Sequence, residues 1–407
     1  MELSRPLHVS TASVRPPLRL GVIGCVLGRS RYHIAIQAAP SINITGIADS
    51  DERNTRIWAR DIGSRVPAFL DVESLLARPE TYDALLIASP LAERAAHCRM
   101  ALEIGKPILL ECPFAPGLND VDMLRVQAES SNLLLMPALP RRFDTHFLAA
   151  TQHLAAGTLG DIQQIRSHWS FPIENVEETG DIVTGGWNSL VLTLGSQTAD
   201  VCRWWQGNGL TVSGDVDLQE LRGSGHNNRG RRTAERALAN IIVTHTLGQS
   251  THHLSRTRAI QSDERYLFTG TTGNMELIIS AGAAAASTTA PALRFQLPGQ
   301  KFQPIRVETP TMSVGKTSLS AASLRIQNLL VHFADCVQLG ETPRITPDDA
   351  YASLEIVQAA YVSTQQNVKV SLPLRRLPDM AQILLNPSHP SSLPALPSAP
   401  TNPNRHS

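Results

Sequence analysis

Three apolar runs in the first third of the chain end in polar residues that could do chemistry. Asp49, Ser89 and Glu111 stand at the ends of these runs, and Cys112 directly follows Glu111. A carboxylate can accept hydrogen bonds from sugar hydroxyls, and an accessible thiolate can exchange a proton or attack an electrophile. Because the carboxyl ends of parallel strands meet at one edge of a sheet, we expect these side chains to share one rim. The spacing therefore predicts a binding site at that edge.

The elements that would position this rim alternate between strand and helix patterns. Short apolar runs that end near glycine or an acid predict strands, and the amphipathic stretches between them predict helices. The expected strands are 18–24, 42–49, 82–89, 107–111 and 133–138, and the expected helices are 30–39, 51–62, 92–103 and 119–130. This alternation indicates an α/β fold with an N-terminal, doubly wound parallel sheet of the Rossmann type, covered by helices on both faces.

The first turn, GCVLGRSRYH (24–33), is where a dinucleotide would bind. Such turns usually have the spacing G-x-G-x-x-G, whereas this chain has only Gly24 and Gly28. Asp49 follows the second strand, where an acid accepts hydrogen bonds from ribose hydroxyls and favours NAD, with NADP as the alternative cofactor. The competing interpretation is that Asp49 only caps the next helix. The predicted cofactor-binding residues are Gly24, Cys25, Leu27, Gly28, Asp49, Arg53, Ser89, Pro90, Glu111 and Arg142.

After Arg142 the pattern changes to alternating strands, which are followed by two helices near 319–339 and 348–364. These elements predict a C-terminal α+β domain with an antiparallel sheet. The expected organisation is a flexible arm at 1–17, the Rossmann domain at 18–142, the α+β domain at 143–375 and a Pro/Ser-rich disordered tail at 376–407. Within the second domain, the arginine-rich stretch 222–236 predicts a solvated insertion, and 281–292 predicts a flexible connection.

Composition argues against several classes of function. Lys plus Arg equals Asp plus Glu at 36 each, which argues against a nucleic-acid partner. No apolar run is long enough to span a bilayer, and the N-terminus lacks the apolar region of a secretory signal. Five cysteines without a C-x-x-C pair argue against disulfides and against a zinc site. We therefore expect a cytoplasmic protein that binds a small-molecule substrate and no metal.

Over residues 18–373, the order of these motifs resembles the Gfo/Idh/MocA family, the glucose–fructose oxidoreductase and inositol dehydrogenase group. The resemblance rests on LRLGVIGC, GIADSDERN, YDALLIASP, ALEIGKPILLECP, PRRFD, GTLGDI, LGSQTADVCRWW and LLVHFADCVQLGETPRITPDDAYASLEIVQAAYVS. It implies a Rossmann domain followed by an α+β domain with an open, mainly antiparallel sheet, through which members commonly form homo-oligomers. It also implies hydride transfer with NAD or NADP to or from a hydroxyl or keto group, often on a sugar or polyol.

The chain departs from the family pattern at positions that usually move the substrate proton. Cys112 stands where the family usually has the lysine of Glu-Lys-Pro, and Gln197 stands where it often has a histidine. Asp200 ends the same family pattern and is retained, whereas Arg94 replaces a further frequent histidine. The resemblance therefore implies that Cys112, Gln197 and Asp200 face the substrate as catalytic residues.

Cys112 has three open interpretations. It is an inert small residue, a member of a working site in which Asp200 or another group moves the proton, or a reactive thiol. Glu111 would raise the pKa of its thiol, and Arg94 would lower it. The function ranked first is an NAD(P)-dependent oxidoreductase with altered catalytic residues. The alternative is a non-catalytic nucleotide sensor or partner-binding regulator.

Overall fold

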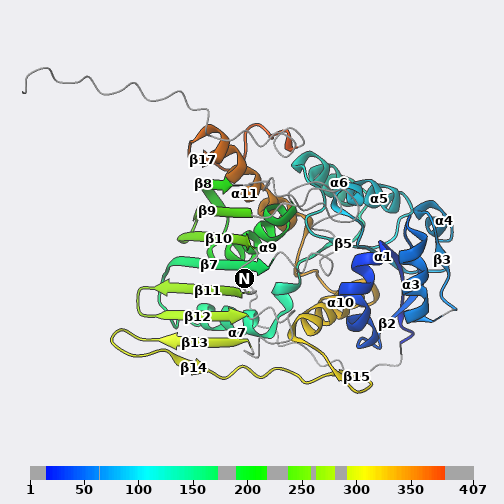
Figure 1. Ribbon diagram of the computed structural model, residues 1–407, viewed down its shortest axis with the longest axis horizontal. Coiled ribbons are helices and arrows are strands. Elements are labelled where there is room, and N and C mark those ends of the chain that lie inside the picture. The colour runs from blue at the N-terminus through cyan, green and yellow to red at the C-terminus, as the bar shows by residue number, and fades with distance from the viewer. Residues whose placement is uncertain are drawn as a thin grey trace, which may run out of the picture.

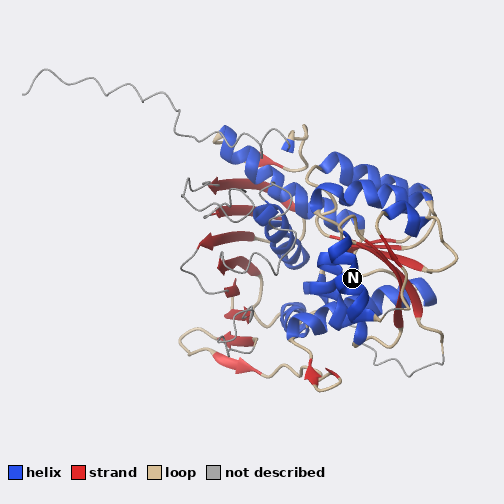
Figure 2. Cartoon of the chain, turned by 45° about the vertical axis from the view of Figure 1, so that its right-hand side comes forward, coloured by secondary structure: helices blue, strands red, loops and turns tan. Residues whose placement is uncertain are grey.

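The computed structural model describes residues 15–63, 65–172, 189–217, 237–257, 263–279 and 291–380. Several expectations lie outside these residues: the arm before residue 15, the insertion 222–236, most of the connection 281–292 and the tail after residue 380. The described chain forms two large sheets, and helices lie between them (Figures 1 and 2).

The N-terminal sheet has six parallel strands in the order β3-β2-β1-β4-β5-β6. The strands are β1 (Leu18–Ile23), β2 (Ile42–Ala48), β3 (Ala68–Phe69), β4 (Ala84–Ile87), β5 (Ile108–Glu111) and β6 (Leu135–Ala138). Every residue of β4 and β5 is buried, because helices cover both faces of a parallel sheet. The strand order reverses at β1, the point at which doubly wound sheets bind ligands. The predicted Rossmann sheet is confirmed.

The helices of this part begin sooner after the first strand than the sequence predicted. They are α1 (Cys25–Leu27), the π-helix η1 (Gly28–Tyr32), α2 (His33–Gln37), α3 (Glu52–Ile62), α4 (Val72–Leu76), α5 (Leu91–Glu103) and α6 (Leu118–Ser130). Helical structure starts at Cys25 instead of residue 30, because Gly24 turns the chain at once with a φ of +98°. α3 ends at Ile62, as predicted, with Asp51 as its N-cap and Gly63 after its end.

The C-terminal sheet has nine strands in the order β14-β13-β12-β11-β7-β10-β9-β8-β17. All neighbouring pairs are antiparallel except β7 and β10, which confirms a mainly antiparallel sheet. The strands are β7 (Ile162–Pro172), β8 (Gly209–Asp217), β9 (Ala237–His245), β10 (Gln249–Thr257), β11 (Asp263–Gly270), β12 (Asn274–Ile279), β13 (Ala292–Gln296), β14 (Gln303–Ile305) and β17 (Val370–Ser371). A separate hairpin pairs β15 (Ser313–Val314) with β16 (Thr317–Ser318).

Helices join the two sheets through a shared apolar core. The remaining helical elements of the described residues are η2 (Pro140–Phe143), α7 (Thr145–Ala155), α9 (Ser189–Gln206), α10 (Ala321–Leu339) and α11 (Pro347–Gln366). α11 packs against β8 on one side and α6 on the other, and α10 packs against α2 and η2. A single cluster of buried side chains contains Leu109 of β5, Leu254 of β10 and Phe333 of α10. The edge of the Rossmann sheet is therefore held against the second sheet by continuous packing.

Among the described helices, none is both long enough and apolar enough to cross a bilayer.

Candidate functional site

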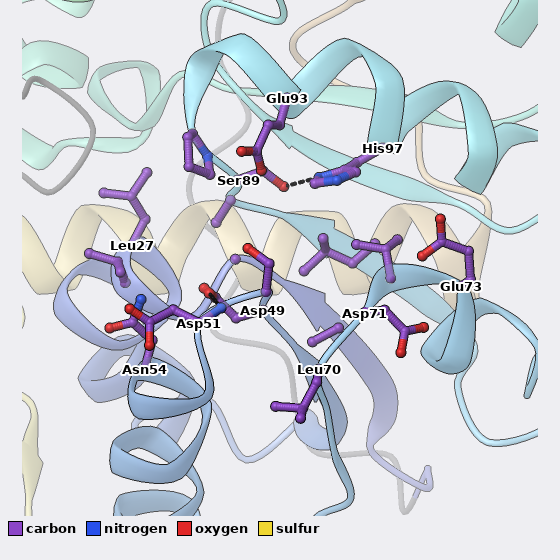
Figure 3. Close-up of a pocket in the computed structure, with 18 residues that line it drawn as sticks. Leu27, Asp49, Asp51, Asn54, Leu70, Asp71, Glu73, Ser89, Glu93 and His97 are labelled. Carbon is purple, nitrogen blue, oxygen red and sulfur yellow. Dashed lines mark hydrogen bonds between the residues drawn. The ribbon is translucent and has the colours of Figure 1, made fainter. Parts of the chain in front are cut away.

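A cavity of about 310 Å³ opens at the carboxyl edge of the parallel sheet, where β1, β2 and β4 end (Figure 3). Half of the predicted cofactor-binding residues line this cavity: Gly24, Leu27, Asp49, Ser89 and Pro90. The other half do not line it: Cys25, Gly28, Arg53, Glu111 and Arg142. Asp49 and Ser89 thus lie at one rim, whereas Glu111, the third strand-end residue expected there, does not line the cavity.

Asp49 ties the end of the second strand to the glycine turn. Its Oδ2 accepts a hydrogen bond from the Cys25 amide at 2.7 Å, and its Oδ1 accepts one from the Asp51 amide at 2.9 Å. The carboxylate that caps α3 belongs to Asp51, which accepts from the Arg53 amide at 2.8 Å. The interpretation of Asp49 as only a helix cap is therefore wrong. Asp49 lines the cavity, and each of its oxygens keeps acceptor capacity for a further donor.

The glycine turn needs its two glycines for close packing. A Cβ on Gly24 would lie 2.4 Å from the Ala88 carbonyl oxygen, and one on Gly28 would lie 2.4 Å from the Trp58 ring. Gly24 thus lets β1 and β4 approach each other under the cavity, and Gly28 lets the first helix lie on α3. The turn is tight although its spacing differs from G-x-G-x-x-G.

Acidic side chains dominate the polar lining of the cavity (Figure 3). The lining carboxylates are Asp49, Asp51, Asp71, Glu73 and Glu93. Neither lysine nor arginine occurs among the described lining residues, and His97 is the basic side chain there. His97 shares a 2.7 Å hydrogen bond with the Ser89 hydroxyl. Burial lowers the pKa of His97, although Glu93 and Glu73 oppose that effect.

Sequence reasoning missed His97. It lies on α5 one helical turn after Glu93, which points to the same cavity, and this i, i+4 spacing is the signal that could have identified it.

Cys112 lies beneath the rim and not in the cavity. Its side chain is buried, at 1% exposure. Burial raises the pKa of its thiol well above the usual range, Asp200 and Glu111 raise it further, and Arg94 lowers it. The expected effects of Glu111 and Arg94 thus have the predicted directions, but burial outweighs both. The arrangement disfavours the thiolate that a reactive cysteine needs.

Glu111 is also buried, and it is bound from the first turn. Its Oε1 accepts hydrogen bonds from Arg31 Nη1 at 2.9 Å and from the Tyr32 hydroxyl at 2.6 Å. Arg31 and Tyr32 of η1, which were not among the predicted site residues, therefore contact the end of β5. The side chain of Arg31 remains 29% exposed, whereas that of Glu111 is 2% exposed.

Gln197 and Asp200 lie on α9, where each is engaged by an arginine of η2. Arg141 donates to the Gln197 side-chain oxygen and holds Glu264 through Nε at 2.6 Å. Arg142 holds Asp200 through Nε at 2.9 Å, and it also contacts Asp349 of α11. The Arg141–Glu264 and Arg142–Asp200 contacts are buried ion pairs that join the two parts of the chain.

Arg53, in contrast, pairs with Asp51 at the surface, and its side chain is 73% exposed.

Comparison with known proteins identifies relatives of this arrangement. Residues 18–139 match the Gfo/Idh/MocA family model, described as an oxidoreductase family with an NAD-binding Rossmann fold. The uncharacterised oxidoreductase YhhX of Escherichia coli is 32% identical over 101 residues, which are 25% of this chain and 29% of YhhX. Inositol 2-dehydrogenase 1 of Saccharopolyspora erythraea is 28% identical over 148 residues, which are 35% of this chain and 43% of that enzyme. The chain thus spans less than half the length of both relatives.

Solved structures match over a greater length. An oxidoreductase from Agrobacterium radiobacter, in complex with NAD+, L-tartaric acid and magnesium, has a TM-score of 0.69 at 18% identity. The match covers 87% of this chain and 98% of that one. Aldose–aldose oxidoreductase from Caulobacter crescentus, complexed with glycerol, has a TM-score of 0.68 at 18% identity and covers 88% of this chain and 100% of its own. These likenesses show a shared fold of both parts.

Proposed function

The chain belongs to the Gfo/Idh/MocA oxidoreductase family through its residues 18–139, and from that premise we propose an NAD-dependent oxidoreductase. Its substrate would be a sugar-like or other small metabolite with a hydroxyl or keto group. The inositol dehydrogenase and aldose–aldose oxidoreductase names among its relatives support this substrate class. The observation that carries the proposal is the cavity at the strand-order reversal, in which Asp49 is bonded to the glycine turn.

The residues of the cavity fit a dinucleotide. Gly24 lines the cavity without a side chain, so a ligand could approach its backbone closely. Asp49 has acceptor capacity for ribose hydroxyls, and Ser89 adds a hydroxyl at the end of β4. When bound, the dinucleotide would supply or accept the hydride.

The acidic lining favours NAD over NADP. NADP carries an additional phosphate of about two negative charges on the adenosine ribose, the group that Asp49 would contact. At an effective dielectric constant of about 20, two unit charges about 4 Å apart repel by roughly 4 kcal/mol. The described lining offers five carboxylates and no arginine or lysine, and the neighbouring Arg53 is already paired with Asp51. We therefore expect the Kd for NADP to exceed that for NAD by at least tenfold.

The proposed reacting centre contains Cys112, Gln197 and Asp200. Their burial and pairing support roles in shape and orientation, because the Cys112 thiol resists ionisation and Arg142 holds Asp200. In the oxidation direction, the substrate carbon would lose a hydride to the bound dinucleotide, and its hydroxyl would lose a proton to solvent. General acid–base assistance contributes about 10²- to 10⁴-fold to such a step, so an enzyme that lacks it is expected to turn over slowly.

Thermal unfolding with each of NAD, NADH, NADP and NADPH tests this proposal. Ligand at 100 times its Kd should stabilise the protein by about 2.7 kcal/mol. The variant Asp49→Asn should weaken NAD binding at least tenfold, whereas Asp120→Asn, a change to an exposed carboxylate on α6, should leave it unchanged. If none of the four nucleotides shifts the transition, the proposal is wrong.

We also propose a homo-oligomer that associates through the face of the nine-stranded sheet opposite α9 and α11. On β9, Ile241 and Val243 are buried toward these helices, whereas Ile242 between them is 44% exposed. Sedimentation equilibrium measures the oligomeric state. A cytoplasmic location is proposed because all five cysteines are free thiols.

A further inference from the structure

Three arginines from separate elements converge beside the proposed reacting centre. Arg31 lies on η1, Arg141 on η2 and Arg325 on α10, and α10 packs against both η1 and η2. Burial lowers the pKa of Arg141 and the charge of Arg31 lowers it further, but Glu264 raises it overall. Burial, and next the charge of Arg141, lower the pKa of the Arg325 guanidinium, and Arg31 adds to this effect. Burial likewise lowers the pKa of Arg31, but Glu111 raises it overall. Arg325 is therefore the one of the three whose guanidinium is destabilised overall.

Two of these arginines touch groups of the reacting centre directly. Arg31 contacts both oxygens of Glu111 through Nη1, at 2.9 and 3.1 Å, and Glu111 directly precedes Cys112 in the sequence. Arg141 donates to Gln197, and its guanidinium stacks 3.9 Å from the centre of the Trp169 ring. The cluster therefore extends from the end of β5 to α9, where the family pattern locates the substrate.

The hydrogen bonds of the three guanidinium groups are distributed unequally. Arg141 uses Nε, Nη1 and Nη2 on Glu264 and Gln197. Arg31 uses only Nη1 among the described residues, although a guanidinium has five N–H donors. Arg325 makes one hydrogen bond with the described part of the chain, from Nη1 to Asp144 Oδ2 at 3.5 Å. Arg31 and Arg325 therefore retain donors that point to no described partner.

The contact to Asp144 compensates Arg325 poorly. The other oxygen of Asp144 is already used, since it accepts from the His146 amide at 2.9 Å and caps α7. The Arg325 side chain is only 16% exposed, so water cannot fully replace the missing partner. A cation that is largely buried and weakly paired is costly, and a bound anion would relieve that cost.

A purely structural role explains Arg141 but not the other two arginines. Arg141 is bonded on all three nitrogens, as expected of a residue that fastens η2 to the second sheet. Arg31 instead keeps 29% of its side chain exposed beside the reacting centre. None of the three arginines lines the acidic cavity that we assign to the dinucleotide. The unused donors of Arg31 and Arg325 therefore lie outside the lining of the dinucleotide cavity.

We propose that Arg31 and Arg325, backed by Arg141, bind an oxyanion of the substrate, so that the enzyme acts on acidic sugar-like compounds in preference to neutral sugars. The oxyanion is a carboxylate or a phosphate, both of which match the planar fork of arginine. This inference rests on the proposed function, because it identifies the substrate class of that same site.

Calorimetric titration of the full-length protein tests the inference with three probes, each with and without saturating NADH. D-Glucuronate represents a carboxylate, D-glucose 6-phosphate a phosphate, and D-glucose the neutral sugar. We expect at least one of the two anions to bind tenfold or more tightly than glucose, and which anion binds identifies the source of the charge. Arg325→Gln should abolish this preference, and Arg325→Lys should restore part of it.

Two outcomes keep the inference separate from the proposed function. The control Arg56→Gln, which removes a surface pair on α3, should bind all probes as the parent protein does. Equal or absent binding of the three sugars, or an anion preference that survives Arg325→Gln, overturns the inference even if NADH binds normally. Absence of NADH binding counts against the proposed function, and the titrations without NADH still report the anion preference.

Discussion

At the scale of single residues, the environment of Cys112 disfavours the reactivity that its residue type suggested. A cysteine in place of the usual lysine suggested altered acid–base chemistry. The side chain is buried beneath the rim, and its surroundings raise the pKa of the thiol. Desolvation disfavours the thiolate, and the single opposing cation, Arg94, does not reverse this. The inert interpretation of Cys112 is the one that its environment favours.

The variant Cys112→Ser therefore tests whether the thiol takes part in turnover. We expect kcat, measured with NAD and a sugar or sugar acid that the parent protein oxidises, to remain within about threefold of the parent value. A thiol reagent should also modify native Cys112 far more slowly than the unfolded chain, because the thiol is buried. A fall in kcat of about 100-fold or more, the size of a general acid–base contribution, would show that the thiol moves a proton.

At the scale of elements, the glycine turn decides whether the cavity exists. Gly24 combines a φ of +98° with backbone contact to β4, where a Cβ would lie 2.4 Å from the Ala88 oxygen. Gly63, after α3, has a similar φ of +104°, but a Cβ there would meet nothing within 4 Å. A side chain at either position would have to adopt a left-handed conformation, and only at Gly24 would its Cβ also overlap with neighbouring backbone.

Alanine substitution at these two glycines separates the two costs. Both Gly24→Ala and Gly63→Ala should lose about 1–2 kcal/mol from the positive φ. Gly24→Ala should lose roughly 1–3 kcal/mol more, because β1 and β4 must move apart, and its NAD affinity should fall. Urea unfolding and nucleotide titration measure both effects. Equal losses of stability at the two positions would mean that the close approach of the strands carries no energy.

At the scale of the whole molecule, a buried chain of hydrogen bonds ties the second sheet together. The Ser167 hydroxyl hydrogen-bonds to His252 Nδ1 at 2.9 Å. The Ser250 hydroxyl hydrogen-bonds to His252 Nε2 at 2.8 Å and to His245 Nε2 at 2.7 Å. His245 Nδ1 hydrogen-bonds to the Gly207 carbonyl at 3.0 Å. A carbonyl only accepts, so His245 carries its proton on Nδ1. All of these hydrogen bonds can form with the imidazole rings of His245 and His252 both neutral.

The two buried histidines of this hydrogen-bond network make the protein less stable in acid. Burial lowers the pKa of His245 to about 4 and that of His252 to about 3, against about 6.5 when unfolded. Below pH 6.5 the unfolded chain therefore takes up protons that the folded chain refuses, so the free energy of unfolding decreases. By linkage the loss reaches about 2 kcal/mol for each histidine at pH 5, and it is absent above pH 7.

Urea unfolding between pH 7.5 and 5 measures this effect. The double variant His245→Gln, His252→Gln should flatten the dependence of stability on pH. His253→Gln should flatten it much less, because His253 lies on the opposite face of β10 and is only half-buried. If the double variant and the parent lose stability equally on acidification, the two histidines are not the source.

The local features of this protein followed from its sequence alone. The alternation of apolar runs and amphipathic stretches predicted the parallel sheet, because periodicity reflects which faces of an element are buried. Asp49 at the rim and Gly24 in the turn were identifiable for the same reason, since a turn residue and a strand end act where they stand in the chain. Helix ends were harder: the glycine turn started its helix five residues early.

The chemistry around the reacting centre was decided only by tertiary structure. Arg142 meets Asp200 across 58 positions and Asp349 across 207, and no local pattern encodes such distances. Burial of Cys112, which sets the pKa of its thiol, arises because helices from both parts of the chain close over the strand ends. The convergence of Arg31 and Arg325 likewise requires α10 to pack back on the first turn. Residue types can be predicted to be reactive, but partners and solvent access determine which of them are.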